Sequence, residues 1–215
     1  ILAPTFTSLP LAAKALSGTG VALCAQDCHW SEEGPFTGEV SARMLAEVGC
    51  RFVILGHSER RELFAETNRR VNMKAVSALF WGLTPIICVG EKEDERASGH
   101  TEMVVEKQLK RCLSELKLDK EQRLMVAYEP VWAIGSGRTP TPHEVDGIHR
   151  LIRRELVATF GEERGAALPI LYGGSANPGN AGPMLALEAV DGVLVGGASL
   201  QAAAETDHRI CQILQ

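Results

Sequence analysis

The sequence lacks the features that mark several specialised classes of protein. No apolar segment approaches the roughly 18 residues of a membrane-spanning helix, and no stretch resembles a signal peptide. The 22 basic and 27 acidic residues form no basic stripe and no charge block, so we expect neither nucleic-acid nor membrane binding. The six cysteines include no Cys-x-x-Cys pair. This argues against a zinc site or a disulfide framework and favours buried, reduced thiols in a cytoplasmic protein.

Short apolar runs alternate along the chain with longer segments of helical period. At 215 residues and 45% hydrophobic composition, with no Gly/Ser- or Pro-rich linker, the chain is expected to form a single domain over residues 1–215. The expected strands are Ile1–Ala3, Val21–Ala25, Phe52–Leu55, Pro85–Val89, Leu124–Ala127, Pro169–Leu171 and Gly192–Val195. The expected helices are Ser41–Val48, Asn68–Phe80, Glu102–Leu116, Pro142–Phe160 and Asn180–Leu187. This alternation predicts an α/β protein with a parallel sheet.

Polar residues or glycines follow the carboxyl ends of most expected strands. They are Gln26, His57, Glu91, Glu129, Gly173–Ser175 and Gly196–Gly197. An open doubly wound sheet would concentrate such residues at one switch point, whereas a closed (β/α)8 barrel collects them on one face. We therefore expect the barrel. Because only seven strand–helix units can be read, the expectation is a barrel that lacks its first strand and helix and leaves two strand edges unpaired.

The stretch "VILGHSERR" places His57 between a buried strand and a short helix. The positive end of a helix disfavours a protonated imidazole, so His57 is expected to be a neutral hydrogen-bond donor. The alternative is a structural role, in which His57 and Glu59 cap the helix and Arg60 forms an ion pair.

The stretch "YEPVWAIGSG" places Glu129 at the end of another strand. Apolar neighbours could tune such a carboxylate into a general base. The apolar segment behind it, held between Pro130 and Gly137, is typical of a lid that closes over a site and excludes water. The alternative is a loop that stays packed on a neighbouring helix. Glu91, after "ICVG", is more typical of a structural ion pair.

Two strands end in matching Gly-Gly sequences, "ILYGGS" and "GVLVGGAS". Glycines at Gly174, Gly196 and Gly197, together with Ser175, let backbone N–H groups approach a ligand closely. In barrels, the loops after the last two strands commonly hold phosphate. The pair therefore predicts an anion site, although tight turns alone could explain either motif by itself.

The connection "DCHWSEEGPFTGE", residues 27–39, is long for this architecture. Its aromatic residues Trp30 and Phe36 favour packing against another surface, and we expect that surface to belong to a partner subunit.

Taken together, these motifs resemble the triosephosphate isomerase family. "AQD", "FTGE", "GHSERR", "CVGE", "AYEPVWAIGSG", "YGGS" and "GVLVGGASL" occur in the family's order and spacing, and the resemblance covers essentially the whole chain. It implies a cytoplasmic (β/α)8 enzyme of glycolysis and gluconeogenesis that works as a homodimer. Its substrate is a small phosphorylated triose, and it uses no cofactor or metal. The reaction is the interconversion of dihydroxyacetone phosphate and D-glyceraldehyde 3-phosphate through an enediolate.

The resemblance also implies roles for individual residues. Glu129 matches the catalytic base, His57 the group that polarises the carbonyl, and Glu59 a supporting carboxylate. The phosphate would be held by Gly135, Ser175, Gly196 and Gly197. The closing lid would comprise Pro130, Val131, Trp132, Ala133, Ile134, Gly135, Ser136 and Gly137. Thr37, Gly38 and Glu39 match the loop that enters the other subunit, with Arg60 as the expected ion-pair partner of Glu39.

The sequence departs from the family pattern at its start. The family's first unit supplies an Asn and a catalytic Lys, and none of the seven lysines here follows a strand in a position to replace that Lys. An alternative is therefore a truncated, catalytically impaired or inactive relative that only binds phosphate ligands or a protein partner. Smaller departures are Asp27 in place of the usual Asn, and Pro140 just beyond the lid.

Overall fold

The computed structural model describes residues 1–176, 179–200 and 210–213. Within these ranges the chain forms eight parallel strands in the order β1-β8-β7-β6-β5-β4-β3-β2. Their bounds are β1 Leu2–Ala3, β2 Cys24–Ala25, β3 Phe52–Leu55, β4 Thr84–Val89, β5 Met125–Tyr128, β6 Ile170–Tyr172, β7 Gly192–Val195 and β8 Ile210–Ile213. A parallel bridge between Leu2 and Leu23, with the Leu2 N–H donating to Ala22 O at 2.9 Å, links β1 back to the start of β2. The strands thus complete a ring, and the expected barrel is confirmed.

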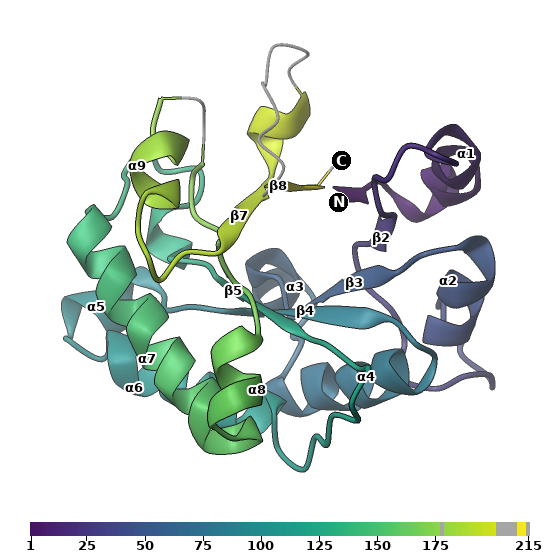
Figure 1. Cartoon of the computed structure of the whole chain (residues 1–215), viewed down its shortest axis with the longest axis horizontal. Helices are drawn as coiled ribbons and strands as arrows, with labels where there is room; N and C mark the ends of the chain where they lie inside the picture. The colour runs from purple at the N-terminus through teal and green to yellow at the C-terminus, as the bar shows by residue number, and fades with distance from the viewer. Residues whose placement is uncertain (177–178, 201–209, 214–215) are drawn as a thin grey trace.

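Strand β8 was not among the expected strands. It pairs with β7 on one side and with β1 on the other, where Leu2 lies opposite Gln212 and Ala3 opposite Ile213. In Figure 1, β8 consequently lies next to the start of the chain. The expectation of two unpaired strand edges is therefore wrong for the described strands, because β8 occupies the position between them.

The helices follow the sequence pattern closely. Their bounds are α1 Leu9–Ala15, α2 Ala42–Val48, α3 Ser58–Leu63, α4 Asn68–Phe80, α5 Glu93–Ala97, α6 Thr101–Cys112, α7 Pro142–Phe160, α8 Glu162–Ala167 and α9 Ala181–Leu185, with 3-10 turns η1 Phe6–Ser8, η2 Val131–Ala133 and η3 Gly197–Leu200. Helices α4 and α7 begin after Thr67 and Thr141, whose side chains accept N–H groups of the first turn. Helix α6 ends four residues earlier than its apolar stripe suggests. The Asn72 amide donates to Cys112 O at 2.9 Å and to Ser114 O at 2.8 Å, which satisfies carbonyls at the helix end.

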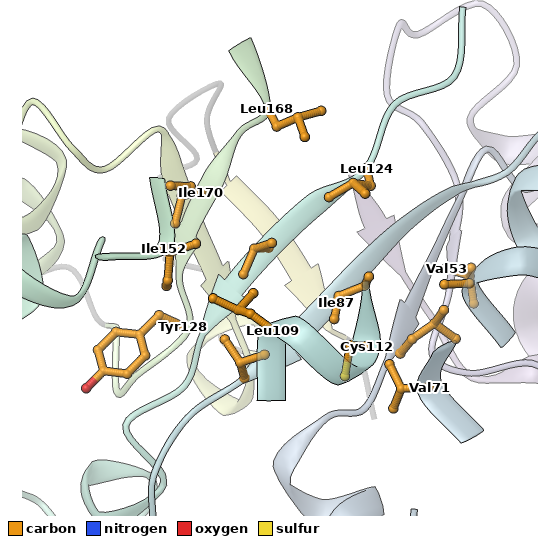
Figure 2. Packing of buried hydrophobic residues seen from close by; sticks show 14 of the residues in the cluster. Val53, Val71, Ile87, Leu109, Cys112, Leu124, Tyr128, Ile152, Leu168 and Ile170 are labelled. Atoms are coloured by element: carbon orange, nitrogen blue, oxygen red, sulfur yellow. The ribbon is translucent and has the colours of Figure 1, made fainter. Parts of the chain in front are cut away.

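Two apolar clusters hold the ring together. The outer cluster lies between the strands and the helices, and Figure 2 shows part of it, including Val53, Val71, Leu109 and Ile152. The inner cluster takes one residue from each of the first seven strands, plus a second from β4: Ala3, Cys24, Ile54, Ile86, Cys88, Ala127, Leu171 and Leu194. Small and branched side chains together fill the barrel, as expected for eight strands. Five cysteines are buried: Cys24, Cys28, Cys50, Cys88 and Cys112.

None of the helices that the structure describes is both long and apolar enough to cross a membrane.

Candidate active site

A pocket of about 570 Å³ opens where the strands end. Its described lining is Phe6, Gln26, Asp27, Ile54, His57, Glu59, Arg60, Phe64, Glu129, Ile134, Gly135, Gly173, Gly174, Ser175, Ala176, Leu194, Gly196, Gly197 and Ala198. These residues come from the carboxyl ends of β2, β3, β5, β6 and β7 and from the segments that follow them, and Phe6 comes from η1 behind β1. The three expected catalytic residues and the four expected phosphate-binding residues thus share one cavity.

Glu129 follows β5 and is almost completely buried, with 2% of its surface exposed. Its Oε2 accepts the backbone N–H of Ser58 at 2.9 Å, and its Oε1 lies 2.9 Å from His57 Nε2. The backbone is fixed as well, because the Glu129 N–H donates to Val89 O at 2.8 Å. A Cβ at Gly90 would lie 1.7 Å from Glu129 O, so only glycine fits beside this turn. The base candidate is therefore held at both ends of the residue.

His57 caps helix α3, and its Nδ1 accepts the Glu59 N–H at 3.4 Å. An accepting Nδ1 leaves the proton of a neutral imidazole on Nε2, the nitrogen that faces Glu129. Burial lowers the pKa of His57, but the carboxylates of Glu129 and Glu59 outweigh this and raise the pKa above its usual value. The contact with Glu129 thus raises the pKa of His57, whereas the helix N-terminus alone was expected to lower it.

Glu59 lies at the edge of the pocket. Its side chain is 54% exposed, and its Oε2 lies 3.9 Å from His57 Nδ1. At this distance and exposure it can modulate the charge of the imidazole only weakly.

The segment after Glu129 is packed at its beginning and exposed at its end. Trp132 is 8% exposed, and its indole N–H donates to Glu91 Oε1 at 2.8 Å while the Arg96 guanidinium lies 3.8 Å from its ring centre. Gly135, Ser136 and Gly137 are exposed. The two readings of this segment thus apply to different halves. The first half is anchored in the protein, and the second half is an exposed tip, of which Gly135 lines the pocket.

Glu91 serves a different purpose from the expected ion pair. It is fully buried and accepts hydrogen bonds from the Tyr128 hydroxyl and the Trp132 indole. Burial raises its pKa, although these hydrogen bonds act in the opposite direction. The carboxylate therefore anchors the start of the lid candidate.

The Gly-Gly loops also line the pocket. The Ser175 hydroxyl donates to Ala133 O at 2.7 Å, which joins the loop after β6 to the lid candidate. A Cβ at Gly174 would meet the Tyr172 hydroxyl at 2.2 Å, so this turn requires glycine. Gly197 is the first residue of the 3-10 turn η3, Gly196 directly precedes it, and both line the pocket.

Sequence reasoning gave no role in the pocket to several of its residues. Arg60 lines the pocket, and its Nη2 lies 2.9 Å from Asp27 Oδ2 and its Nε 3.6 Å from Glu66 Oε2. Within the chain, Arg60 therefore pairs with Asp27 and Glu66 and not with Glu39, its expected partner. Arg60 follows His57 by three residues in "GHSERR", and this closeness to a candidate catalytic residue was the signal that could have placed it in the pocket. The partners could not be read, because they come from other segments.

The expected dimer-loop residues lie on the surface. Thr37, Gly38 and Glu39 are all exposed, and the Glu39 N–H donates to Phe36 O at 3.0 Å to close the turn. The ring of Phe36 packs on His29 at 4.2 Å between centres. The loop tip is thus ordered by its own contacts.

Comparisons with known proteins agree with this geometry. A family model described as triosephosphate isomerase matches residues 1–214. The triosephosphate isomerase of Chlorobaculum tepidum is 49% identical over 94% of this chain and 81% of its own length. That of Aquifex aeolicus is 46% identical over 93% of this chain and 80% of its length. A crystal structure of triosephosphate isomerase from Bartonella henselae superposes with a TM-score of 0.85 at 39% identity, covering 94% of this chain and 81% of the other. The chain belongs to the triosephosphate isomerase family.

Proposed function

We propose that Glu129 and His57 carry the proton transfers of triose phosphate isomerisation in this pocket. As a member of the family, the chain is an isomerase that interconverts dihydroxyacetone phosphate and D-glyceraldehyde 3-phosphate. This aldose–ketose exchange moves one proton between neighbouring carbons and another between their oxygens. It needs one base for carbon and one donor for oxygen. The contact of 2.9 Å between Glu129 Oε1 and His57 Nε2, inside a closed apolar ring, is the observation that supports these roles.

The resting contacts suggest how the two residues engage substrate. A carbonyl oxygen that accepts the Nε2–H of His57 displaces Glu129 from the imidazole and leaves the carboxylate free to act on carbon. The pKa of His57 then loses the contribution of Glu129, and burial, which lowers it, dominates. The imidazole therefore works as a neutral donor to the developing enediolate oxygen.

The phosphate end of the substrate belongs at the Gly-Gly loops. Ser175, Gly196 and Gly197 line the same pocket as Glu129, and Gly135 lines it from the lid segment. Backbone N–H groups of this kind bind phosphate without a formal positive charge. Because Ser175 already contacts Ala133 in the lid segment, phosphate bound here couples substrate to lid closure. Residues Pro130 to Gly137 form that lid, which shields the enediolate from water.

The surface favours a homodimer. Leu63 and Phe64, at the end of helix α3, are 72% and 60% exposed, and Phe6 and Phe36 are 39% and 38% exposed. Apolar side chains of this size are common in the buried centres of dimer interfaces. Together with the loop of Thr37, Gly38 and Glu39, they form the face that we assign to the second subunit. The buried cysteines fit a cytoplasmic location.

The test is a coupled assay of the wild-type protein and of Glu129→Gln, which keeps the size of the side chain but removes the base. We expect wild-type turnover of glyceraldehyde 3-phosphate and a loss in kcat of about 10²–10⁴-fold in the variant, with little change in KM. Full activity in Glu129→Gln would overturn the assignment of the base. Binding of a phosphorylated triose without turnover by the wild type would support a non-catalytic relative instead.

A further inference from the structure

Four charged side chains form a group beside the pocket, here called the ionic quartet: the buried Asp27, Glu66 and Lys74 and the partly exposed Arg60. Lys74 Nζ lies 2.6 Å from Asp27 Oδ1 and also contacts Glu66 Oε1. Arg60 bridges the same two carboxylates from the other side. Asp27, Glu66 and Lys74 are only 4%, 6% and 4% exposed. Two acids and two bases balance to zero formal net charge, so each carboxylate has a basic partner inside the protein.

The quartet joins four separate parts of the barrel. Asp27 follows β2, Arg60 lies in α3, Glu66 lies in the loop between α3 and α4, and Lys74 lies within α4. The proposed mechanism gives no role to any of them. A buried ionic group is costly to form and is weak evidence for stability alone. A role other than stability should therefore be visible in the contacts that the quartet makes with neighbouring groups.

One hydrogen bond connects the quartet to the segment that carries His57. Glu66 Oε2 accepts the backbone N–H of Gly56 at 3.1 Å, and Gly56 directly precedes His57. The carbonyl of the same glycine accepts Arg61 Nε at 2.7 Å. Gly56 has a φ of +70°, and a Cβ there would lie 2.7 Å from Val71 Cγ2 and 2.8 Å from Arg61 Nη2. The turn that aims His57 is thus fixed at both of its polar groups and leaves no spare space.

We propose that the ionic quartet positions His57, acting through the hydrogen bond from Gly56 to Glu66. This inference rests on the proposed role of His57 in the reaction. Lys74 and Arg60 hold the Glu66 carboxylate in place, and the carboxylate fixes the peptide on the amino side of His57. The imidazole is thereby directed at Glu129 and at the substrate carbonyl. Glu66 and Lys74 do not line the pocket as described, so they are positioning residues rather than catalytic ones.

The decisive variant is the double substitution Glu66→Met with Lys74→Met. It replaces one acid and one base by apolar chains of similar length, so the quartet keeps zero net charge through Asp27 and Arg60. Charge-balanced replacements of this kind are often neutral for stability. The matched control is Glu66→Gln with Lys74→Met, which makes the same change of charge but keeps a side-chain oxygen that can accept the Gly56 N–H.

We expect the double variant to fold and to lose about tenfold or more in kcat, with KM changed by less than about twofold, because a catalytic group displaced by even 1 Å is much less effective. We expect the control to keep a kcat at least about fivefold above that of the double methionine variant, even if both unfold at a lower urea concentration. The ¹⁵N and ¹H resonances of the His57 ring should shift in the double variant and stay in place in the control.

Two outcomes overturn the proposal. One is a double variant with wild-type kcat and unchanged His57 resonances. The other is an equal loss of kcat in the control, which would show that the charges of the quartet matter and that the acceptor for the Gly56 N–H does not. The ring resonances can be read without any turnover. A wild-type protein without isomerase activity would therefore refute the proposed function while leaving the positioning testable.

Discussion

The Ser58 N–H and the Glu129 carboxylate are joined by a hydrogen bond of 2.9 Å across 71 positions of sequence. The bond ties the first residue of helix α3 to the end of strand β5, and it holds the proposed base in a resting position. A buried carboxylate that accepts a backbone N–H is stabilised more strongly than a neutral acceptor would be. The contact should therefore be visible in both stability and activity.

Replacing Ser58 by Pro removes this donor alone. Proline is tolerated at the first position of a helix, and His57, with φ −50° and ψ 144°, already has the conformation required before proline. We expect Ser58→Pro to lower the free energy of unfolding by about 1.5–3 kcal/mol through the unpaired carboxylate, as measured by urea denaturation. Ser58→Ala, which keeps the N–H, is the control. Equal stability of the two variants would show that the bond contributes nothing.

The buried carboxyl of Glu91 should make stability depend on pH. Burial raises its pKa above the usual 4.5, so the native state binds this proton more tightly than the unfolded chain. Its contribution to stability is present below pH 4.5 and is lost as the pH rises through the raised pKa. Glu91→Gln keeps an acceptor for Trp132 and removes the titration. The stability of the variant relative to wild type should therefore increase with pH over this range in urea unfolding series. A constant difference would contradict this account.

Two glycines should respond to alanine in opposite ways. At Gly90 a Cβ would lie 1.7 Å from Glu129 O, so Gly90→Ala must displace the base, and we expect a loss of about 3 kcal/mol or more. Gly147 lies inside helix α7, and a Cβ there would meet no atom within 4 Å. Gly147→Ala should therefore stabilise the protein by about 0.5–1 kcal/mol. Thermal unfolding of both variants would check this prediction. A destabilising Gly147→Ala would contradict the expectation that alanine fits the open space there and favours the helix.

Association should depend on the exposed residues at the end of α3. Leu63 is 72% exposed, so Leu63→Asp should not disturb the fold of one subunit but should place a charge in the proposed interface. We expect sedimentation analysis to show a dimer for wild type and a monomer for Leu63→Asp. Phe80→Asp is the control, because Phe80 is 75% exposed at the end of α4 and belongs neither to α3 nor to the loop of Thr37, Gly38 and Glu39. A monomeric wild type, or dissociation caused by Phe80→Asp instead, would refute the assigned face.

Much of the site could be predicted because its residues stand in order behind strands. Apolar runs place His57 and Glu129 at strand ends, and parallel strands bring their carboxyl ends to one face. The pattern also predicted the bounds of α4 and α7, since each begins after a Thr that caps it. Local sequence is sufficient where capping and periodicity agree.

The rest depended on contacts between distant segments. The partners of Arg60 lie after β2 and in the loop before α4, and no local pattern links them. Strand β8 is four residues long, and its pairing with β1 and β7 rather than its own composition makes it a strand. The role of Glu91 was missed for a related reason, because its donors, Tyr128 and Trp132, follow it by 37 and 41 positions.

The position of β8 also sets an order on events during synthesis. Its partner β1 comprises residues 2 and 3, whereas β8 begins at residue 210, so β1 leaves the ribosome long before β8 is made. The pairs from β2 to β7 and the bridge to β1 can form as the chain emerges, but the ring stays open until residues 210–213 are outside the exit tunnel. During that interval the edges of β1 and β7 are exposed to neighbouring nascent chains. Slow elongation between the codons for β7 and β8 would lengthen the time for which both edges are exposed together, while pauses before β7 would leave that time unchanged.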